Sequence, residues 1–357
     1  MDLTMDGRKE PPQPGQSLLE LVKQLGLDGS TLTERPLAAK IAGEVFTLNY
    51  IPVRQKEAEA DRQSMRRAMA ASNGEIRLLR YADPAGKECY IRTAQFVIFL
   101  AIRQLWPEAT AKMTCTLGSS VYISVAGAKD FSASTLKARV SELVGQDIPL
   151  IRRRVKLQKA IDRFREEGQT DKARLLSWRT VDYFDEYAYG DFADYYYGEM
   201  MPSTGYLTVW DILPADGGFV FVYPDDGNPE ICAKVPPMPN FFSVYNEGER
   251  WGELMECQTV ADLNDLTNSG RIRELIRVNE ALHEKRFSQV ADQVCQRGAK
   301  AVLLAGPSSS GKTTSANRLA TQLRVHGKKP ILMSLDDYYI DRDKIAPGPD
   351  GKLDLEH

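Results

Sequence analysis

The sequence predicts a multidomain protein that combines the α/β and α+β classes. Its 357 residues are enough for two or three domains. Strand-like and helix-like segments alternate irregularly over the first two thirds of the chain, which is typical of α+β domains. Near the C-terminus, a short apolar run leads through a glycine-rich loop into a helical pattern, as in parallel α/β domains. The 43% hydrophobic and 27% charged residues are ordinary for globular proteins.

Composition excludes several classes of protein. The net charge of -3 argues against a chain-wide nucleic-acid-binding surface, although a local basic patch is compatible with it. The longest apolar run, Phe96 to Ile102, is too short to span a membrane, and the charged N-terminus is not a secretory signal. Five scattered cysteines without a Cys-x-x-Cys pair indicate reduced thiols and a cytoplasmic location. The three histidines are too few for a multi-histidine metal centre.

The first part of the chain predicts a small α+β module. Residues 1–13 are polar and contain Pro11 and Pro12, so we expect a flexible arm. Residues 14–82 then form one module of ubiquitin-like size. Within it we expect a helix capped by Ser17 and ending near Leu27, two strands over 37–48 around Gly43-Glu44, a strand over 75–80, and an exposed helix or insertion over 55–71.

Residues 83–235 predict a second α+β module. Its strongest signal is an amphipathic helix over Thr93–Trp106, ended by Pro107. We expect strands over 113–117 and 121–125, and helices over 134–144 and 155–167.

Two segments of this module leave alternatives open. The run Arg152-Arg153-Arg154 favours a solvated helix start over an RNA contact. The tyrosine-rich segment 183–197 favours packing aromatics over a base-stacking surface. Prolines at 236–239 then mark a break, and residues 236–297 predict a helical linker. Within it we expect two helices over 263–297, with helical periodicity at 274–278 and 281–287 and with Gly298 ending the second helix.

Residues 298–357 carry the pattern of a phosphate-binding loop. An apolar run over 301–304 precedes Gly306-x-x-x-x-Gly311-Lys312-Thr313. Glycines let backbone N–H groups point at phosphate oxygens, Lys312 would neutralise the phosphates of ATP, and Thr313 would hold Mg²⁺. A Gly/Ser surface turn is the alternative. The residues assigned to the nucleotide are Gly306, Pro307, Ser308, Ser309, Ser310, Gly311, Lys312, Thr313 and Thr314.

An acidic pair follows the next predicted strand. A helix over 315–325 leads to a buried strand over 330–335, which ends at Asp336-Asp337. Because parallel sheets bind ligands at the carboxyl ends of their strands, Asp336 is expected near the terminal phosphate. It could accept a proton from an attacking hydroxyl or hold Mg²⁺. A capping role after a strand is the structural alternative.

Gly306 to Thr314, followed by Ser334-Leu-Asp-Asp-Tyr-Tyr, resembles the uridine kinase and phosphoribulokinase family of P-loop kinases. The resemblance implies that Asp336 is the catalytic base and that Tyr339 contacts a nucleoside. It further implies that residues 298–357 are the N-terminal part of a kinase domain, since Asp350 to His357 is similar to the family's next segment. A chain ending there is expected to be inactive alone.

The first 230 residues carry a second resemblance. Residues 14–82 resemble a TGS module, and residues 92–223 are similar to the second additional domain of threonyl-tRNA synthetase, through Leu105-Trp-Pro-Glu-Ala109 and Gly190-Asp-Phe-Ala-Asp194. In that domain, His-x-x-x-His and Cys-x-x-x-His pairs form a deacylation site. The corresponding positions here hold Arg92, Phe96, Tyr196 and Met200, so we expect the fold without deacylation.

Together these features lead to three hypotheses. The first is an ATP- and Mg²⁺-dependent kinase that phosphorylates the 5′-hydroxyl of uridine or cytidine, with Lys312 and Asp336 as catalytic residues. The second is an RNA- or tRNA-associated regulatory protein that uses the P-loop as a nucleotide-sensing switch, with RNA bound by the N-terminal modules. The third is a hydrolase in the middle domain, for which Cys115 and Cys232 are the candidate thiols. We expect no membrane partner, and an oligomer is compatible with all three hypotheses.

Overall fold

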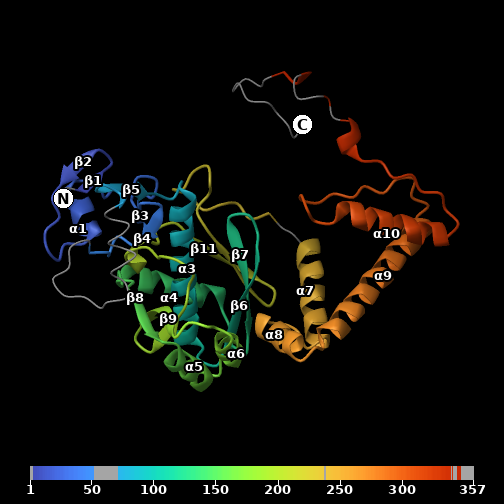
Figure 1. Cartoon of the computed structure of the whole chain (residues 1–357), viewed down its shortest axis with the longest axis horizontal. Helices are drawn as coiled ribbons and strands as arrows, with labels where there is room; N and C mark the ends of the chain where they lie inside the picture. Colours follow the sequence, from blue (N-terminus) through green and yellow to red (C-terminus); the bar gives the residue numbers. More distant parts are fainter. Residues whose placement is uncertain (1–2, 52–70, 237–238, 339, 341–343, 347–357) are drawn as a thin grey trace. The chain divides into compact units, whose positions relative to one another are not determined.

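The computed structural model describes residues 3–51, 71–236, 239–338, 340 and 344–346 (Figure 1). The chain divides into two compact units, Met1–Val244 and Tyr245–His357. The first unit contains three β-sheets with helices packed on them, which confirms a mixed multidomain α/β protein. Within the described ranges, no helix is long and apolar enough to cross a bilayer.

A five-stranded sheet opens the first unit. Its order is β2-β1-β5-β3-β4, with β1 and β5 parallel and the other neighbours antiparallel. Helix α1, Leu18–Gln24, packs on one face, and a capping box between Ser17 and Glu20 starts it as predicted. The strands are β1 Leu3–Met5, β2 Arg8–Glu10, β3 Ala38–Ile41, β4 Glu44–Phe46 and β5 Glu75–Leu79.

The predicted flexible arm over residues 1–13 is wrong for the described part of that segment. Strands β1 and β2 form a hairpin, and Leu3 and Met5 are almost fully buried against α1. Asp6 and Gly7 have φ values of 46° and 80°, as the two-residue turn of a tight hairpin requires. The alternating Leu-Thr-Met pattern was hidden by the charged residues around it. The predicted helix or insertion at 55–71 falls almost entirely outside the described residues.

A four-stranded antiparallel sheet, ordered β11-β12-β7-β6, forms the centre of the first unit. Helix α3, Pro84–Leu105, packs against it, and eleven of its residues are buried. The helix begins nine residues before the predicted start because Pro84 occupies its first turn, and it ends just before Pro107 as predicted. The other elements are β6 Thr110–Thr116, β7 Ser120–Ala126, α4 Ala133–Gly145, β11 Asp211–Ala215 and β12 Gly218–Val222.

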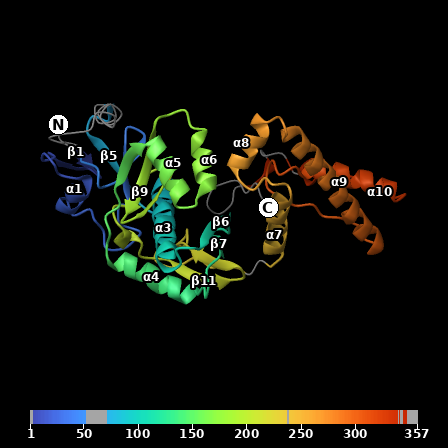
Figure 2. The ribbon, with the colours of Figure 1, turned by 90° about the horizontal axis from the view of Figure 1, so that it is seen from below.

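A three-stranded sheet, ordered β10-β9-β8, completes the first unit. Its strands are β8 Arg152–Lys156, β9 Tyr183–Tyr189 and β10 Phe192–Asp194. Helices α5, Leu157–Glu166, and α6, Thr170–Ser177, pack side by side and share a core with Phe184 (Figure 2). The predicted helix start at Arg152-Arg153-Arg154 is therefore wrong. The three arginines lie in a strand because acidic groups of β9 and of residue 199 neutralise them.

The second unit contains helices and no strand in its described residues. Two helices cover the range predicted for them over 263–297, and the second, α9, ends just before Gly298 as predicted. The periodic stretches 274–278 and 281–287 both belong to α9. The parallel α/β arrangement predicted for 298–357 is not observed in the described residues. The expected strands at 301–304 and 330–335 pair with no other strand there and are mostly exposed, with Leu303 95% and Ile331 85% exposed. A parallel pair needs neighbours on both faces, and the described residues do not provide them. The helices are α7 Pro239–Leu254, α8 Val260–Asn268, α9 Ile272–Gln296 and α10 Lys312–Val325.

Gly86 makes α3 sensitive to a single methyl group. A Cβ at this position would lie 2.1 Å from the backbone oxygen of Arg80. We expect Gly86→Ala to lower the free energy of unfolding by about 2 kcal/mol or more, since a backbone atom has to move. Gly145→Ala, in α4 with open space around the new methyl, is the matched control and should be neutral or slightly stabilising. Urea unfolding measures the free energy of unfolding of both variants. Equal changes would contradict the close contact between Gly86 and the backbone of Arg80.

Candidate functional site

The four positions expected at a deacylation site lie together. Arg92 and Phe96 are one turn apart on α3, and the segment from Tyr196 to Met200 passes over them. The Phe96 ring lies 6.2 Å from the Tyr196 ring, and the Arg92 guanidinium donates a hydrogen bond of 2.8 Å to the backbone oxygen of Glu199. The structure thus brings together all four residues that the sequence assigned to this place.

A buried threonine fixes the segment on the helix. The Thr93 hydroxyl donates to the backbone oxygen of Cys89 and accepts from the N–H of Met201, at 2.9 and 3.0 Å. Gly198 is needed in the same segment, because its φ is +126° and an added Cβ would meet the Arg92 guanidinium at 2.6 Å. These contacts explain why the segment from Tyr196 to Met200 packs closely on α3.

The site is a packed apolar core. Phe96 and Met200 are fully buried, and a second ring, Phe192, lies 5.4 Å from Phe96. The Tyr196 hydroxyl is buried without a hydrogen-bond partner among the described residues, and burial raises its pKa well above the usual value. In the described part of the chain, no three His, Cys, Asp or Glu side chains come together in a way that could hold a metal ion. None of the four side chains at positions 92, 96, 196 and 200 is a thiol or an imidazole.

A buried carboxylate, that of Glu199, binds two neighbouring polar side chains beside this core. The Glu199 side chain pairs with Arg152 at 2.9 Å and accepts a hydrogen bond of 3.1 Å from the Tyr187 hydroxyl. Burial raises the pKa of Glu199, and the Arg152 charge acts in the opposite direction. Arg92 also pairs with Glu88 at 2.5 Å. Both arginines therefore serve the fold.

Sequence reasoning missed Cys89, although it lies three residues before Arg92 on the same helix. Its sulfur is 3.9 Å from the Arg92 guanidinium and is fully buried. Burial raises the pKa of the thiol to about 12, against the opposing effect of Arg92. The pKa values of Cys115 and Cys232, the thiols named for a hydrolase, are also raised by burial. Burial therefore works against the thiolate form at all three cysteines.

We expect Cys89 to escape thiol reagents in the folded protein. At pH 8 a thiol with a pKa near 12 is almost entirely protonated, and no solvent reaches it. Labelling with iodoacetamide, read by peptide mass spectrometry, should modify Cys89 only after denaturation. Modification of Cys89 in native protein, as fast as in the denatured chain, would show that the segment over α3 opens readily.

The phosphate-loop residues gather at the start of α10. Gly311 has a φ of +80° and precedes the helix, and Lys312 folds back so that its ammonium donates to the backbone oxygens of Gly306 and Pro307, both at 2.8 Å. Thr313 and Thr314 lie exposed in the first turn. Asp336 is exposed in a 3-10 turn, Leu335–Tyr338, and no contact joins it to Lys312 among the described residues. Tyr339 lies outside the described residues.

A cleft of about 670 Å³ adjoins this loop, between α9 and α10. Arg318 of α10 pairs with Glu284 of α9 at 2.6 Å, and Gln322 donates to the same carboxylate at 3.1 Å. Sequence reasoning had treated α9 only as a linker and so missed its contribution. The residues of α9 that line the cleft are Arg277, Glu280, Ala281, His283, Glu284 and Phe287.

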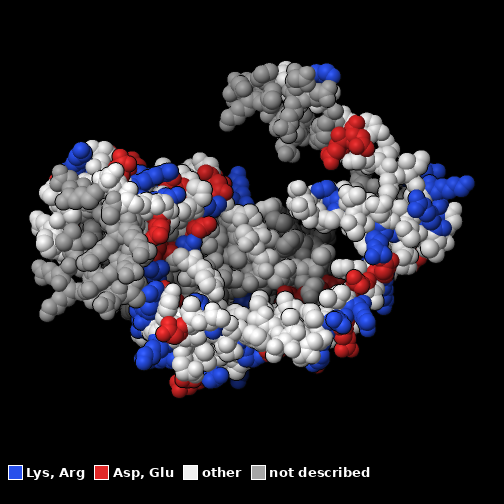
Figure 3. Space-filling model, in the orientation of Figure 1, with Lys and Arg blue, Asp and Glu red and all other residues white. Residues whose placement is uncertain are grey.

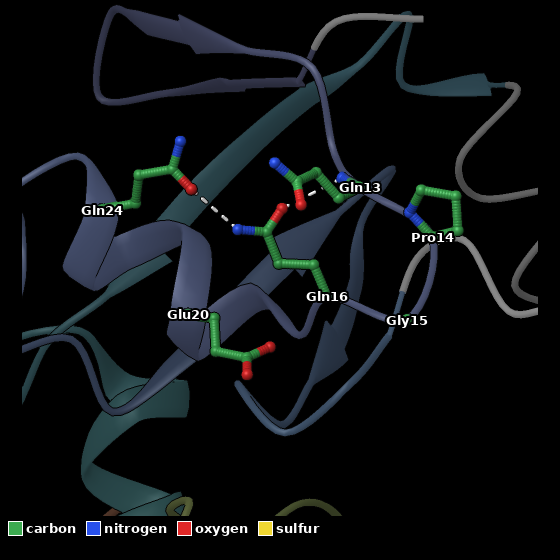
Figure 4. A pocket seen from close by; sticks show the side chains of 6 residues that line it. All are labelled: Gln13, Pro14, Gly15, Gln16, Glu20 and Gln24. Atoms are coloured by element: carbon green, nitrogen blue, oxygen red, sulfur yellow. Dashed lines mark hydrogen bonds between the residues drawn. The ribbon is translucent and has the colours of Figure 1, made fainter.

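A second hollow, near the N-terminus, offers no comparable chemistry. Its polar groups largely satisfy one another: Gln16 accepts from the N–H of Gln13 and donates to Gln24 (Figure 4). The Glu20 carboxylate is engaged in capping α1. This hollow is a product of the loop geometry before α1.

Comparison with known proteins finds threonine–tRNA ligases among the relatives of this chain, and no protein-family model matches it. A threonine–tRNA ligase of Halorhodospira halophila is 25% identical over 209 residues, which are 57% of this chain and 31% of the ligase. The ligase of Symbiobacterium thermophilum is 25% identical over 215 residues, 59% of this chain and 30% of the ligase. That of Carboxydothermus hydrogenoformans is 26% identical over 207 residues, 56% of this chain and 29% of the ligase.

These matches correct the kinase hypothesis. An alignment of more than 200 residues has to include part of the first unit, because the second unit holds only residues 245–357. The relatives named here are threonine–tRNA ligases, not nucleoside kinases. The hypothesis of a uridine or cytidine kinase is therefore wrong. The roles assigned to Lys312 and Asp336 stay predictions. The chain spans about a third of the length of the curated relatives it matches, and in sequence it is similar to part of threonine–tRNA ligases.

Proposed function

We propose that this protein is an RNA-associated protein whose first unit binds tRNA. The observation that carries the proposal is the similarity of more than half of the chain to threonine–tRNA ligases. The matched part is too short to carry over the whole activity of a ligase, so binding is the property proposed.

Two features of the first unit support this proposal. The sheet order β2-β1-β5-β3-β4, with parallel β1 and β5 and one helix across it, suits the TGS-like module proposed for residues 14–82, extended by the first hairpin. The packed core at Phe96 and Met200 suits residues 83–235 as a synthetase-like domain that binds RNA without deacylating it. Residues 236–297 are then a helical connection to the loop at 306–314.

The loop at 306–314 supports a second proposal, that the protein binds ATP as a regulatory ligand. The Lys312 ammonium is held by two backbone oxygens beside the exposed N-terminus of α10, so phosphate oxygens could replace these partners. Thr313 would be a ligand of the accompanying Mg²⁺. Lys312→Ala should abolish ATP binding measured by calorimetry, while Lys328→Ala, in the loop after α10, should leave it unchanged. ATP binding that survives Lys312→Ala would overturn this assignment.

The tRNA proposal is tested by competition. A fluorescently labelled tRNA should bind the full chain, and unlabelled tRNA should compete for the site far better than a DNA duplex of equal length. Competition by both polymers to the same extent would reduce the proposal to general polyanion binding and would contradict it. In a separate assay, incubation of the full chain with mischarged aminoacyl-tRNA should release no free amino acid.

A further inference from the structure

Positive charge is concentrated in one segment of the first unit. Residues 151–183 contain ten Lys and Arg against five Asp and Glu, in a chain whose net charge is -3. The segment covers β8, α5, α6 and the start of β9. Figure 3 shows Lys and Arg atoms along the edge of the molecule where Figure 1 draws β8 and α5. Within the first unit, this excess of positive charge attracts polyanions to the edge formed by residues 151–183.

The pairing of β8 with β9 places basic and aromatic groups on one face. Side chains alternate along a strand, so Arg154 and Lys156 point to the same side, where the register sets them opposite Asp185 and Tyr183. The Arg154 guanidinium donates to both carboxylate oxygens of Asp185, at 2.8 and 2.9 Å, and lies 4.0 Å over the Tyr183 ring. The Arg154 guanidinium is thus held over an aromatic ring by its two hydrogen bonds.

This arrangement is suited to an unpaired base beside a phosphate. The Tyr183 residue is 38% exposed, and a ring fixed by a guanidinium keeps its orientation when a base stacks nearby. Lys156 and Lys159 are exposed in the same segment and carry charge toward solvent. An acidic protein would use the lysines but has no need of the ordered aromatic ring, so single-stranded RNA is the partner that uses both features.

We propose that Arg154, Lys156 and Tyr183, on one face of the β8–β9 pair, form the RNA-binding surface of this protein together with Lys159 at the start of α5. An unpaired base would stack at Tyr183, with phosphates near the lysines. The inference rests on the proposed tRNA association and adds where the RNA is held. It also revises the sequence-based preference for a purely structural role of the tyrosines and of the arginine run.

A matched pair of tyrosines tests the stacking. Tyr183 and Tyr189 are both 38% exposed and lie on the same face of β9, but the guanidinium lies over Tyr183. Tyr183→Ala should weaken tRNA binding by about tenfold, within the range measured for loss of one stacked base. Tyr183→Phe, which keeps the ring, and Tyr189→Ala should each change the affinity less than about twofold. Equal losses for Tyr183→Ala and Tyr189→Ala would overturn the stacking role.

A matched pair of double charge reversals tests the phosphate contacts. Lys156→Glu with Lys159→Glu should weaken tRNA binding by tenfold or more at about 0.1 M salt and reduce its salt dependence by about two phosphates. Lys112→Glu with Lys129→Glu, two exposed positions in and after the central sheet, makes the same charge change elsewhere. Similar losses of tRNA affinity in the two double variants would contradict the proposed RNA-binding surface. Thermal unfolding checks that all variants fold.

The two proposals fail in different ways. If the unaltered chain does not bind tRNA, both the proposed function and the proposed RNA-binding surface are wrong. If the unaltered chain binds tRNA and the Tyr183 and lysine variants bind equally well, only this surface is wrong.

Discussion

Replacing Glu186 with Ala is expected to lower the free energy of unfolding of the first unit by about 3 kcal/mol or more. The Glu186 carboxylate is fully buried, and it lies 2.7 Å from Arg153 and 2.5 Å from Arg163. Its removal leaves two guanidinium groups without their shared buried partner. Arg153 is half exposed and can regain water, which places the expected loss at the lower end of the range for broken buried pairs.

Urea unfolding of the full chain, followed by tyrosine and tryptophan fluorescence, measures this loss. The matched control is Asp162→Ala, because Asp162 pairs with Arg165 on the same helix, α5, but both partners are more than half exposed. An exposed pair of this kind contributes less than about 1 kcal/mol. Similar effects for the two variants would show that Glu186 is not the charge that holds β8, β9 and α5 together.

Phe96→Ala should have an effect of similar size, about 3 to 5 kcal/mol, by leaving a cavity in the packed core. Phe96 is fully buried and contacts Phe192 and Tyr196 at centroid distances of 5.4 and 6.2 Å. Phe96→Leu, which retains most of the volume, should cost less than about 1.5 kcal/mol.

This pair of variants separates a core from a ligand pocket. In a ligand pocket, truncation of a lining side chain costs little stability because solvent already fills the space. A loss below about 1 kcal/mol for Phe96→Ala would therefore contradict the packed-core description and would reopen the site to a bound substrate.

Local signals in the sequence predicted local structure well. Ser17 begins α1 because its hydroxyl caps the helix, and the turn at Gly43 joins β3 to β4 as expected. Pro107 follows the end of α3. Each of these features depends on residues a few positions apart, which a single sequence displays directly.

Features that depend on distant residues could not be predicted in this way. The run Arg152-Arg153-Arg154 forms a strand because Asp185 and Glu186, more than thirty residues later, neutralise it. The apolar runs at 301–304 and 330–335 have a strand composition, but no sheet forms around them in the described residues. Amino-acid composition determines the propensity of a segment for the extended conformation. Whether the segment becomes a strand of a sheet depends on the neighbours available to pair with it.

The candidate site was predictable in part. Positions 92 and 96 share a helical face, so their proximity followed from their spacing, and the resemblance named the facing residues. The buried Glu199, whose backbone oxygen accepts from Arg92 and whose carboxylate pairs with Arg152, lies far from both residues in the sequence and had no signal there. The kinase hypothesis depended on a short loop motif, whereas the similarity to threonine–tRNA ligases extends over more than half of the chain.

The central claim is that the first unit binds tRNA through phosphate contacts, and a salt titration of binding tests it most directly. The affinity of the full chain for tRNA, measured by fluorescence anisotropy between 50 and 200 mM salt, should fall by about tenfold or more as contacts to several phosphates weaken. This result, with the slope lowered in the Lys156→Glu and Lys159→Glu double variant, is the one predicted here. Absence of tRNA binding at 50 mM salt would contradict the account.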